Sequence, residues 1–109
     1  MGNFSRKKVF ALAKGFRKRS KNCYSIAIRK VHKSLKYEYI SRRLKKRDMR
    51  RSWIHTISAA SREHGIPYSR FMMLLTRSNI TLDRKILANL ALNEPWSFKS
   101  IVDEVVEQN

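Results

Sequence analysis

The residues best suited to chemistry in this chain are cations that crowd one short stretch. Seven Lys and Arg side chains fall within residues 42–51, RRLKKRDMRR, beside a single acid, Asp48. On a helix that turns by roughly 100° per residue, these cations cover an arc of about 240°. Lys and Arg side chains neutralise phosphate groups. The stretch therefore predicts a helix that is surrounded by polyanion on several sides.

The width of this arc helps to decide whether the anionic partner is a membrane surface, DNA or RNA. A helix on a membrane surface needs a wide apolar face opposite its basic one, and only a narrow sector around Tyr37 and Leu44 is free of charge. A helix that reads DNA needs side chains for base edges and usually a dimer, and neither signal is present. Folded RNA can enclose a basic helix. We therefore expect an RNA partner, no membrane and no homo-oligomer, with a basic helical DNA-binding architectural protein as the alternative.

Charge is distributed unevenly along the 109 residues, whose formal net charge is +17. Residues 1–65 contain 20 Lys and Arg and 3 acids, whereas residues 66–109 contain 5 of each. Such an excess of charge would make a compact chain repel itself without a polyanionic partner. We predict a basic RNA-binding arm over residues 1–52 and a compact domain over residues 53–109.

Both parts are expected to be helical, which gives an all-α fold. A short helix over 5–14 should end at Gly15, and no Gly or Pro then occurs before Gly65. A very long second helix is predicted from a cap at Ser20 or Asn22 to about His64. Three short helices are predicted for the small C-terminal bundle, over 67–79, 81–93 and 94–108, with Thr81 as the cap of the middle one.

Apolar residues at helical spacing mark the faces expected in the core. The end of the long helix contributes Trp53, Ile54, Ile57 and Ala60, and the short helices contribute Phe71, Leu74, Leu75, Ile86, Leu87, Leu90, Phe98, Ile101, Val102 and Val105. Among the basic residues of the arm, Phe16, Tyr24, Tyr37 and Tyr39 are candidates to stack on bases or ribose, or to pack locally.

No constellation for catalysis or metal binding is found. Cys23 is the only cysteine, and the histidines have no ligand spacing relative to it. The acids of the C-terminal half are scattered as helix caps and surface charges, and no nucleophile lies near a base. We predict that the chain is not an enzyme and that it needs no metal and no cofactor. A small enzyme with a basic tail is the weakest alternative.

Three ordered motifs resemble the L20 family of bacterial-type large-subunit ribosomal proteins. YEYISRRLKKRDMRRSWI (37–54) is similar to the family's Y-x-Y-x-x-R-R-x-x-K-R-x-x-R-x-x-W-I, and SAASREHGIPYSRF (58–71) is similar to its A-A-x-R-x-x-G-x-x-Y-S-x-F. LDRKILANLA (82–91) is similar to D-R-K-I-L-A-x-[IL]-A. The resemblance implies an all-helical structural protein that binds large-subunit rRNA, contacts neighbouring ribosomal proteins and supports subunit assembly.

Matching by position also implies which side chains bind rRNA. The arm candidates are Lys14, Arg17, Arg19, Arg42, Arg43, Lys45, Lys46, Arg47, Arg50 and Arg51. The weaker domain candidates are Arg62, His64, Tyr68, Ser69, Arg70, Arg84 and Lys85. As an alternative to RNA binding, Tyr68 and Ser69 only begin a helix. The alternative for Arg84 and Lys85 is an ion pair with Asp83 inside the domain. Trp53 is expected to be a packing anchor.

The sequence departs from the bacterial pattern at several places. Lys18 stands where bacterial members have a glycine, and NCY (22–24), EHG (63–65) and EPWSFKS (94–100) resemble the mitochondrial branch more closely. The expected location is therefore the mitochondrial matrix, within the ribosome. A bacterial or plastid ribosome is the alternative.

Overall fold

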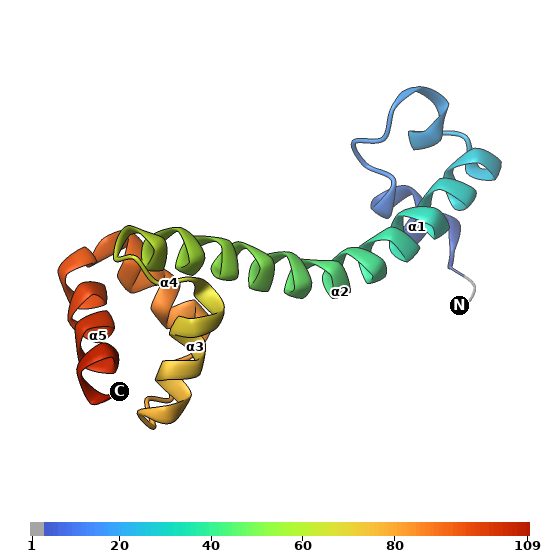
Figure 1. Cartoon of the computed structure of the whole chain (residues 1–109). Helices are drawn as coiled ribbons and strands as arrows, with labels where there is room; N and C mark the ends of the chain where they lie inside the picture. The colour runs from blue at the N-terminus through green and yellow to red at the C-terminus, as the bar shows by residue number, and fades with distance from the viewer. Residues whose placement is uncertain (1–3) are drawn as a thin grey trace. The chain divides into compact units, whose positions relative to one another are not determined.

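A computed structural model of the chain describes residues 4–109, and these residues are helical without any strand (Figure 1). The elements, in chain order, are α1 Arg6–Leu12, the 3-10 helix η1 Lys18–Lys21, α2 Tyr24–Glu63, α3 Tyr68–Arg77, α4 Arg84–Asn93 and α5 Pro95–Gln108. The predicted all-α class and the predicted very long second helix are thus confirmed.

The chain divides into two compact units, and the boundary between them falls within α2, between Lys45 and Lys46. This boundary lies a few residues before the one predicted at residues 52/53, which stays a prediction. Helix α2 has 40 residues and continues through the boundary without interruption. Its length follows from the absence of Gly and Pro between Gly15 and Gly65, because these two residues are the strongest helix breakers.

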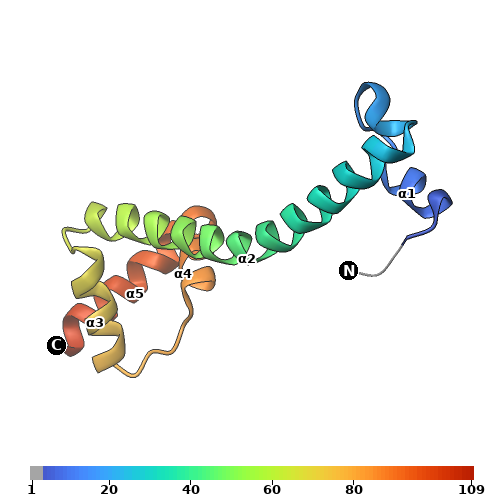
Figure 2. The same ribbon diagram turned by 90° about the vertical axis from the view of Figure 1, so that its right-hand side faces the viewer.

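The first unit has a small core of its own, which the sequence analysis did not predict. Val9 and Ala13 from the α1 segment pack against Ala27 and Val31 of α2, and all four are fully or almost fully buried. Both views show α1 beside the first turns of α2 (Figures 1 and 2). Ser5 caps α1 by accepting a hydrogen bond from the Lys8 amide at 3.2 Å.

The beginning of α2 differs from the prediction. Neither Ser20 nor Asn22 caps it, because the chain first forms η1 and passes through a left-handed conformation at Lys18, with φ of 54°. The first helical bond of α2 instead joins the Ala27 amide to the Cys23 carbonyl, at 2.7 Å. This tight turn brings the loop around Gly15 and Arg17 back along α2.

The ends of α2 and α3 follow the predicted stop signals. Gly65 (φ 80°) and Asn79 (φ 57°) both adopt the left-handed conformation that closes a helix. After α2, the Ile66 amide donates to the Ser61 carbonyl at 3.1 Å, and after α3 the Ile80 amide donates to Leu75 in the same way. These bonds satisfy carbonyls that a helix end would otherwise leave without partners.

The second unit buries one continuous core beneath the C-terminal part of α2. Helix α5 packs against α3 and α4, and Figure 2 shows these three helices gathered beside the last turns of α2. The buried residues are Ile57, Phe71, Leu74, Leu75, Leu87, Ala88, Phe98, Val102 and Val105. Trp53 packs at its edge, as expected of an anchor.

Helix α4 required two corrections. Thr81 is not its cap: the Asp83 carboxylate accepts a hydrogen bond from the Ile86 amide at 2.8 Å, so the helix begins two residues later than predicted. Ile86, predicted in the core, is 45 % exposed, and Ala88 is buried beside Leu87 in its place. Asp prevails because its carboxylate accepts from the exposed amides and also suits the positive end of the helix dipole.

Candidate nucleic-acid interface

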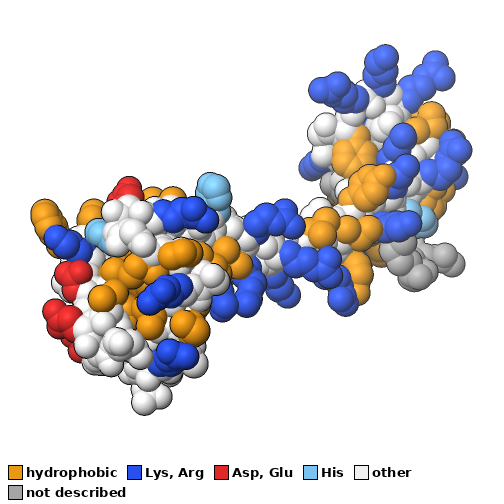
Figure 3. Space-filling view, in the orientation of Figure 1, with side chains coloured by type: hydrophobic (Ala, Val, Ile, Leu, Met, Phe, Trp, Pro, Cys, Tyr) orange, Lys and Arg blue, Asp and Glu red, His pale blue; other side chains and the backbone are white. Residues whose placement is uncertain are grey.

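The basic stretch of α2 lies wholly at the surface. Every residue from Ser41 to Ser52 is exposed, including the apolar Leu44 and Met49. The seven cations of residues 42–51 therefore extend around the helix without being covered by other described residues. Figure 3 shows Lys and Arg side chains on both units, whereas the acidic side chains visible on this face lie on the second unit.

Few of these cations have partners within the chain. Among residues 4–109 the structure shows one ion pair, in which Arg51 lies 3.6 Å from the Asp48 carboxylate, and both side chains are largely exposed. Such an exposed pair contributes at most about 1 kcal/mol. Arg43 lies over the ring of Tyr39, with 4.7 Å from Cζ to the ring centroid. The other candidates of this stretch remain available to a polyanion.

The N-terminal candidates surround the loop between α1 and α2. Lys14 follows α1, Arg17 precedes η1 and Arg19 lies within it, and all three are exposed. Of the four aromatic candidates, Tyr24 is half-buried against the first core and lies beneath the Arg6 guanidinium, 4.7 Å from Cζ to the ring centroid. Tyr24 is therefore a packing residue in this unit.

The domain candidates separate into exposed residues and one internal pair. Arg62, His64, Ser69, Arg70 and Lys85 are exposed. Tyr68 and Arg84 are half-buried, and the Arg84 Nε–H donates a hydrogen bond to the Tyr68 hydroxyl at 2.9 Å. The suggested ion pair of Arg84 or Lys85 with Asp83 is not formed. Tyr68 and Arg84 were both predicted as rRNA-binding candidates of the domain, but nothing in the sequence indicated the hydrogen bond between them.

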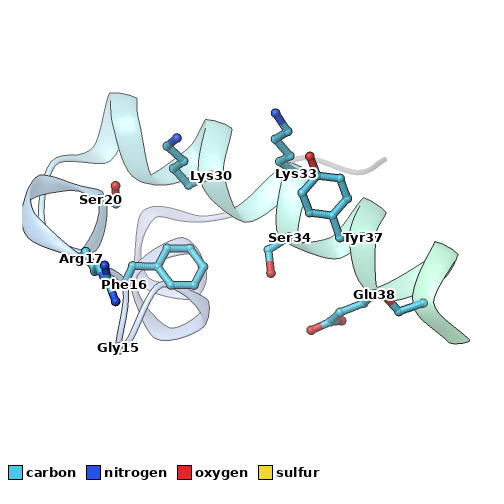
Figure 4. Close-up of a pocket in the computed structure, with 10 residues that line it drawn as sticks. Gly15, Phe16, Arg17, Ser20, Lys30, Lys33, Ser34, Tyr37 and Glu38 are labelled. Atoms are coloured by element: carbon cyan, nitrogen blue, oxygen red, sulfur yellow. The ribbon is translucent and has the colours of Figure 1, made fainter. Parts of the chain in front are cut away.

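A groove of about 720 Å³ lies in the first unit, between the loop after α1 and one face of α2 (Figure 4). Its lining residues are Gly15, Phe16, Arg17, Ser20, Lys30, Lys33, Ser34, Tyr37, Glu38 and Ser41. Only Arg17 among them belongs to the predicted rRNA-binding set. The sequence contained a sign of this groove face. Residues four positions apart lie on the same side of a helix, and this spacing gives two adjacent rows on α2, Lys30–Ser34–Glu38 and Lys33–Tyr37–Ser41.

No helix among residues 4–109 is long and apolar enough to cross a membrane. No three His, Cys, Asp or Glu side chains within residues 4–109 are placed to hold a metal ion. Cys23 is half-buried at the beginning of α2, and hydrogen bonding from the Ser25 hydroxyl and the Ile26 amide lowers the pKa of its thiol.

Comparison with known proteins decides the family. The family model described as "Ribosomal protein L20" matches residues 2–101. The chain belongs to the ribosomal protein L20 family. It is 55 % identical over 97 residues to the large ribosomal subunit protein bL20 of Ehrlichia canis, with coverage of 89 % of this chain and 78 % of that protein.

Two further members of the L20 family give the same result. The bL20 protein of Rhodospirillum centenum is 51 % identical over 98 residues, covering 90 % of this chain and 82 % of that protein. The bL20 protein of Rickettsia prowazekii is 52 % identical over 98 residues, covering 90 % and 84 %. The resemblance that the three motifs carried is thus confirmed over nearly the whole chain.

One departure from the bacterial L20 pattern has a structural meaning. Lys18 stands where the resemblance expects glycine in bacterial members, and its φ of 54° lies in the region where glycine is favoured. A lysine at this turn must hold a left-handed backbone that costs an L-residue roughly 1–2 kcal/mol. The loop that carries Arg17 and Arg19 is therefore built with local strain.

Proposed function

We propose that this chain is a structural constituent of the large ribosomal subunit, where it binds large-subunit rRNA and supports assembly. Its membership of the L20 family carries the proposal, since its relatives are named as large-subunit proteins. The chain is not an enzyme, because the family is one of structural ribosomal proteins.

Exposed charge around α2 supplies the mechanism. Seven cations within residues 42–51 are exposed around the helix, and they neutralise phosphates of rRNA segments that pack on its different sides. With Lys14, Arg17 and Arg19 the arm offers ten cations, and ten phosphate contacts would give a log–log salt slope of roughly −7 to −9. This term is almost independent of sequence, so specificity comes from the shape of the folded RNA.

The residues proposed to contact rRNA fall into sets according to their exposure and their partners within the chain. The exposed arm residues Lys14, Arg17, Arg19, Arg42, Arg43, Lys45, Lys46, Arg47, Arg50 and Arg51 form the main set. Arg62, His64, Ser69, Arg70 and Lys85 form a second set on the domain. Tyr68 and Arg84 are better explained by their mutual hydrogen bond. Neighbouring ribosomal proteins are further proposed partners.

The compartment is a separate part of the proposal. The three relatives described above are bacterial, which supports a bacterial ribosome over the mitochondrial one predicted from the sequence. Fractionation of the source cells, followed by detection of the chain, distinguishes the cytoplasm from the mitochondrial matrix.

Sedimentation tests the function directly. The tagged chain should sediment with large subunits and remain there at moderate salt. A soluble pool that instead binds duplex DNA as tightly as rRNA would support the architectural DNA-binding alternative and contradict this proposal.

A matched pair of double variants tests the basic surface of the second unit. Replacing Arg47 and Arg50 with Ala should reduce the magnitude of the salt slope for rRNA binding by about 1.4–1.8, since each lost phosphate contact contributes roughly 0.7–0.9. Replacing Arg77 and Lys99, which are exposed but outside the proposed set, removes the same charge and should change the slope much less. Equal effects would show that only total charge matters.

A further inference from the structure

The groove of the first unit combines features that a generic phosphate-binding surface does not need. One wall is the loop with Phe16 and Arg17, and the other is the α2 face formed by the rows Lys30–Ser34–Glu38 and Lys33–Tyr37–Ser41. Cations, an aromatic ring, hydroxyl groups and a carboxylate thus line one space of about 720 Å³. This volume is sufficient for a single nucleotide.

Phe16 provides a stacking surface in this groove. Its ring is half-buried because it also packs against the first core, and this packing fixes its position. Figure 4 shows the ring pointing from the loop towards α2. Stacking on an aromatic ring is how proteins hold unpaired bases, whichever base is present.

Three cations line the same groove. Arg17 comes from the loop, and Lys30 and Lys33 come from α2, so positive charge is available on both walls. Lys33 also lies over the Tyr37 ring, 5.7 Å from its centroid, and 54 % of Tyr37 is exposed. A nucleotide in the groove would have its flanking phosphates neutralised from two directions.

Glu38 is the residue that phosphate binding leaves unexplained. It is the only acid before Asp48 in the sequence, it is exposed, and it takes part in no ion pair within the described chain. Arg42 follows four residues later, at a spacing that permits pairing, yet no such pair forms. A carboxylate here repels phosphate, and it is suited to accept hydrogen bonds from a base. Guanine offers two adjacent donors, N1–H and N2–H₂, that match its two oxygens.

We infer that this groove binds one unpaired guanine of RNA, stacked on Phe16 and recognised by the Glu38 carboxylate through N1–H and N2–H₂. Arg17, Lys30 and Lys33 neutralise the phosphates on either side. The guanine must be unpaired, in a loop or bulge, because pairing occupies the edge that Glu38 recognises. The inference rests on the proposed rRNA-binding function and adds a base-specific contact to it.

Hairpin RNAs that differ in one bulged nucleotide test the inference with the full chain. Five hairpins carry G, A, C, U or inosine at the bulge, and fluorescence anisotropy gives each Kd at two salt concentrations. The G hairpin should bind at least about fivefold more tightly than the A, C and U hairpins, as expected of a two-bond contact. Inosine lacks the N2 amino group, so its Kd should lie between those of G and A.

Two charge-matched variants assign this preference to one carboxylate. Glu38→Gln should bring the five Kd values within about twofold of one another, whereas Asp48→Asn, which removes the same charge from α2 outside the groove, should preserve the preference for G. Phe16→Leu keeps the core filled and should weaken binding to all five hairpins by about fivefold or more, through loss of stacking.

The outcomes distinguish failure of the guanine site from failure of the proposed rRNA-binding function. Equal Kd values for the five hairpins, or a G preference that survives Glu38→Gln, overturn the guanine site while sedimentation with large subunits still supports the proposed function. Failure to bind any hairpin, together with failure to sediment with large subunits, overturns both.

Discussion

The Arg84 Nε–H donates a hydrogen bond to the Tyr68 hydroxyl at 2.9 Å, and this bond joins the first turn of α3 to the first turn of α4. The two residues are 16 positions apart and both are half-buried. The beginnings of the two helices are thus linked by a side-chain bond across α3 and the connection 78–83. We expect this bond to stabilise the second unit, so a structural role for Tyr68 and Arg84 is favoured over the predicted RNA contact.

Removal of this hydroxyl should weaken the fold without affecting RNA binding. Tyr68→Phe should reduce the free energy of unfolding by about 1 kcal/mol, the usual net worth of such a hydrogen bond. Urea unfolding followed by the fluorescence of Trp53 and Trp96, both in the second unit, measures the loss. The control Tyr39→Phe removes a hydroxyl from an exposed ring that makes no hydrogen bond to another described residue. Unchanged stability with weaker rRNA binding would return Tyr68 to the RNA-contacting set.

The second unit should fold without the first. A fragment of residues 46–109 contains the complete core of that unit, and it should unfold cooperatively. Phe71→Ala in this fragment should cost about 3–5 kcal/mol, since Phe71 is fully buried and its ring centroid lies 5.4 Å from that of Phe98. A domain of this size has roughly 3–5 kcal/mol in total, so the variant should lose its cooperative transition.

A control in the same helix separates burial from composition. Met73 is 44 % exposed on α3, and Met73→Ala should change the free energy of unfolding by only about 0.5 kcal/mol. Circular dichroism during urea titration compares the two variants. A fragment that shows no cooperative transition even with the native sequence would mean that the unit needs the preceding residues.

Helix breakers and apolar spacing made much of this fold predictable. The absence of Gly and Pro between Gly15 and Gly65 specified the length of α2, and the spacing of Phe71, Leu74 and Leu75 specified the buried face of α3. Both features depend on local physics, in which each residue acts within one or two turns of its own helix. Such signals are contained in the sequence itself.

Contacts between distant segments were not predictable in the same way. The packing of Val9 on Ala27, the groove beside Phe16, and the bond from Arg84 to Tyr68 each join separate elements. The cap of α4 was misplaced for another reason: Thr81 and Asp83 are both good caps, and the Asp83 carboxylate is the one that accepts from a helix amide.

The strained turn at Lys18 should be relieved by glycine. Lys18→Gly removes the left-handed penalty of roughly 1–2 kcal/mol, offset in part by the greater entropy that glycine loses on folding. A net gain of about 0.5–1 kcal/mol is expected for the first unit, visible as slower amide hydrogen exchange at Ala27 and Val31. Lys21→Gly, in the same short helix but without a positive φ, should accelerate exchange. Faster exchange in both variants would contradict the assignment of strain to residue 18.

Cys23 should ionise at lower pH than an ordinary cysteine. The Ser25 hydroxyl, 3.6 Å from the Cys23 Sγ, is the main cause that lowers the pKa of this thiol, followed by the Ile26 amide. Both stabilise the thiolate, which is the form that reacts with alkylating agents. The rate of alkylation by iodoacetamide should therefore rise at lower pH in the folded chain than in urea.

Ser25→Ala removes the largest cause of this shift, so the alkylation profile should move towards higher pH. Ser41→Ala alters an exposed hydroxyl of the same helix that lies outside the surroundings of Cys23, and it should leave the profile in place. The pH dependence of the alkylation rate, measured by mass spectrometry, compares the three chains. If the profile stays unchanged in Ser25→Ala, the Ser25 hydroxyl does not stabilise the thiolate.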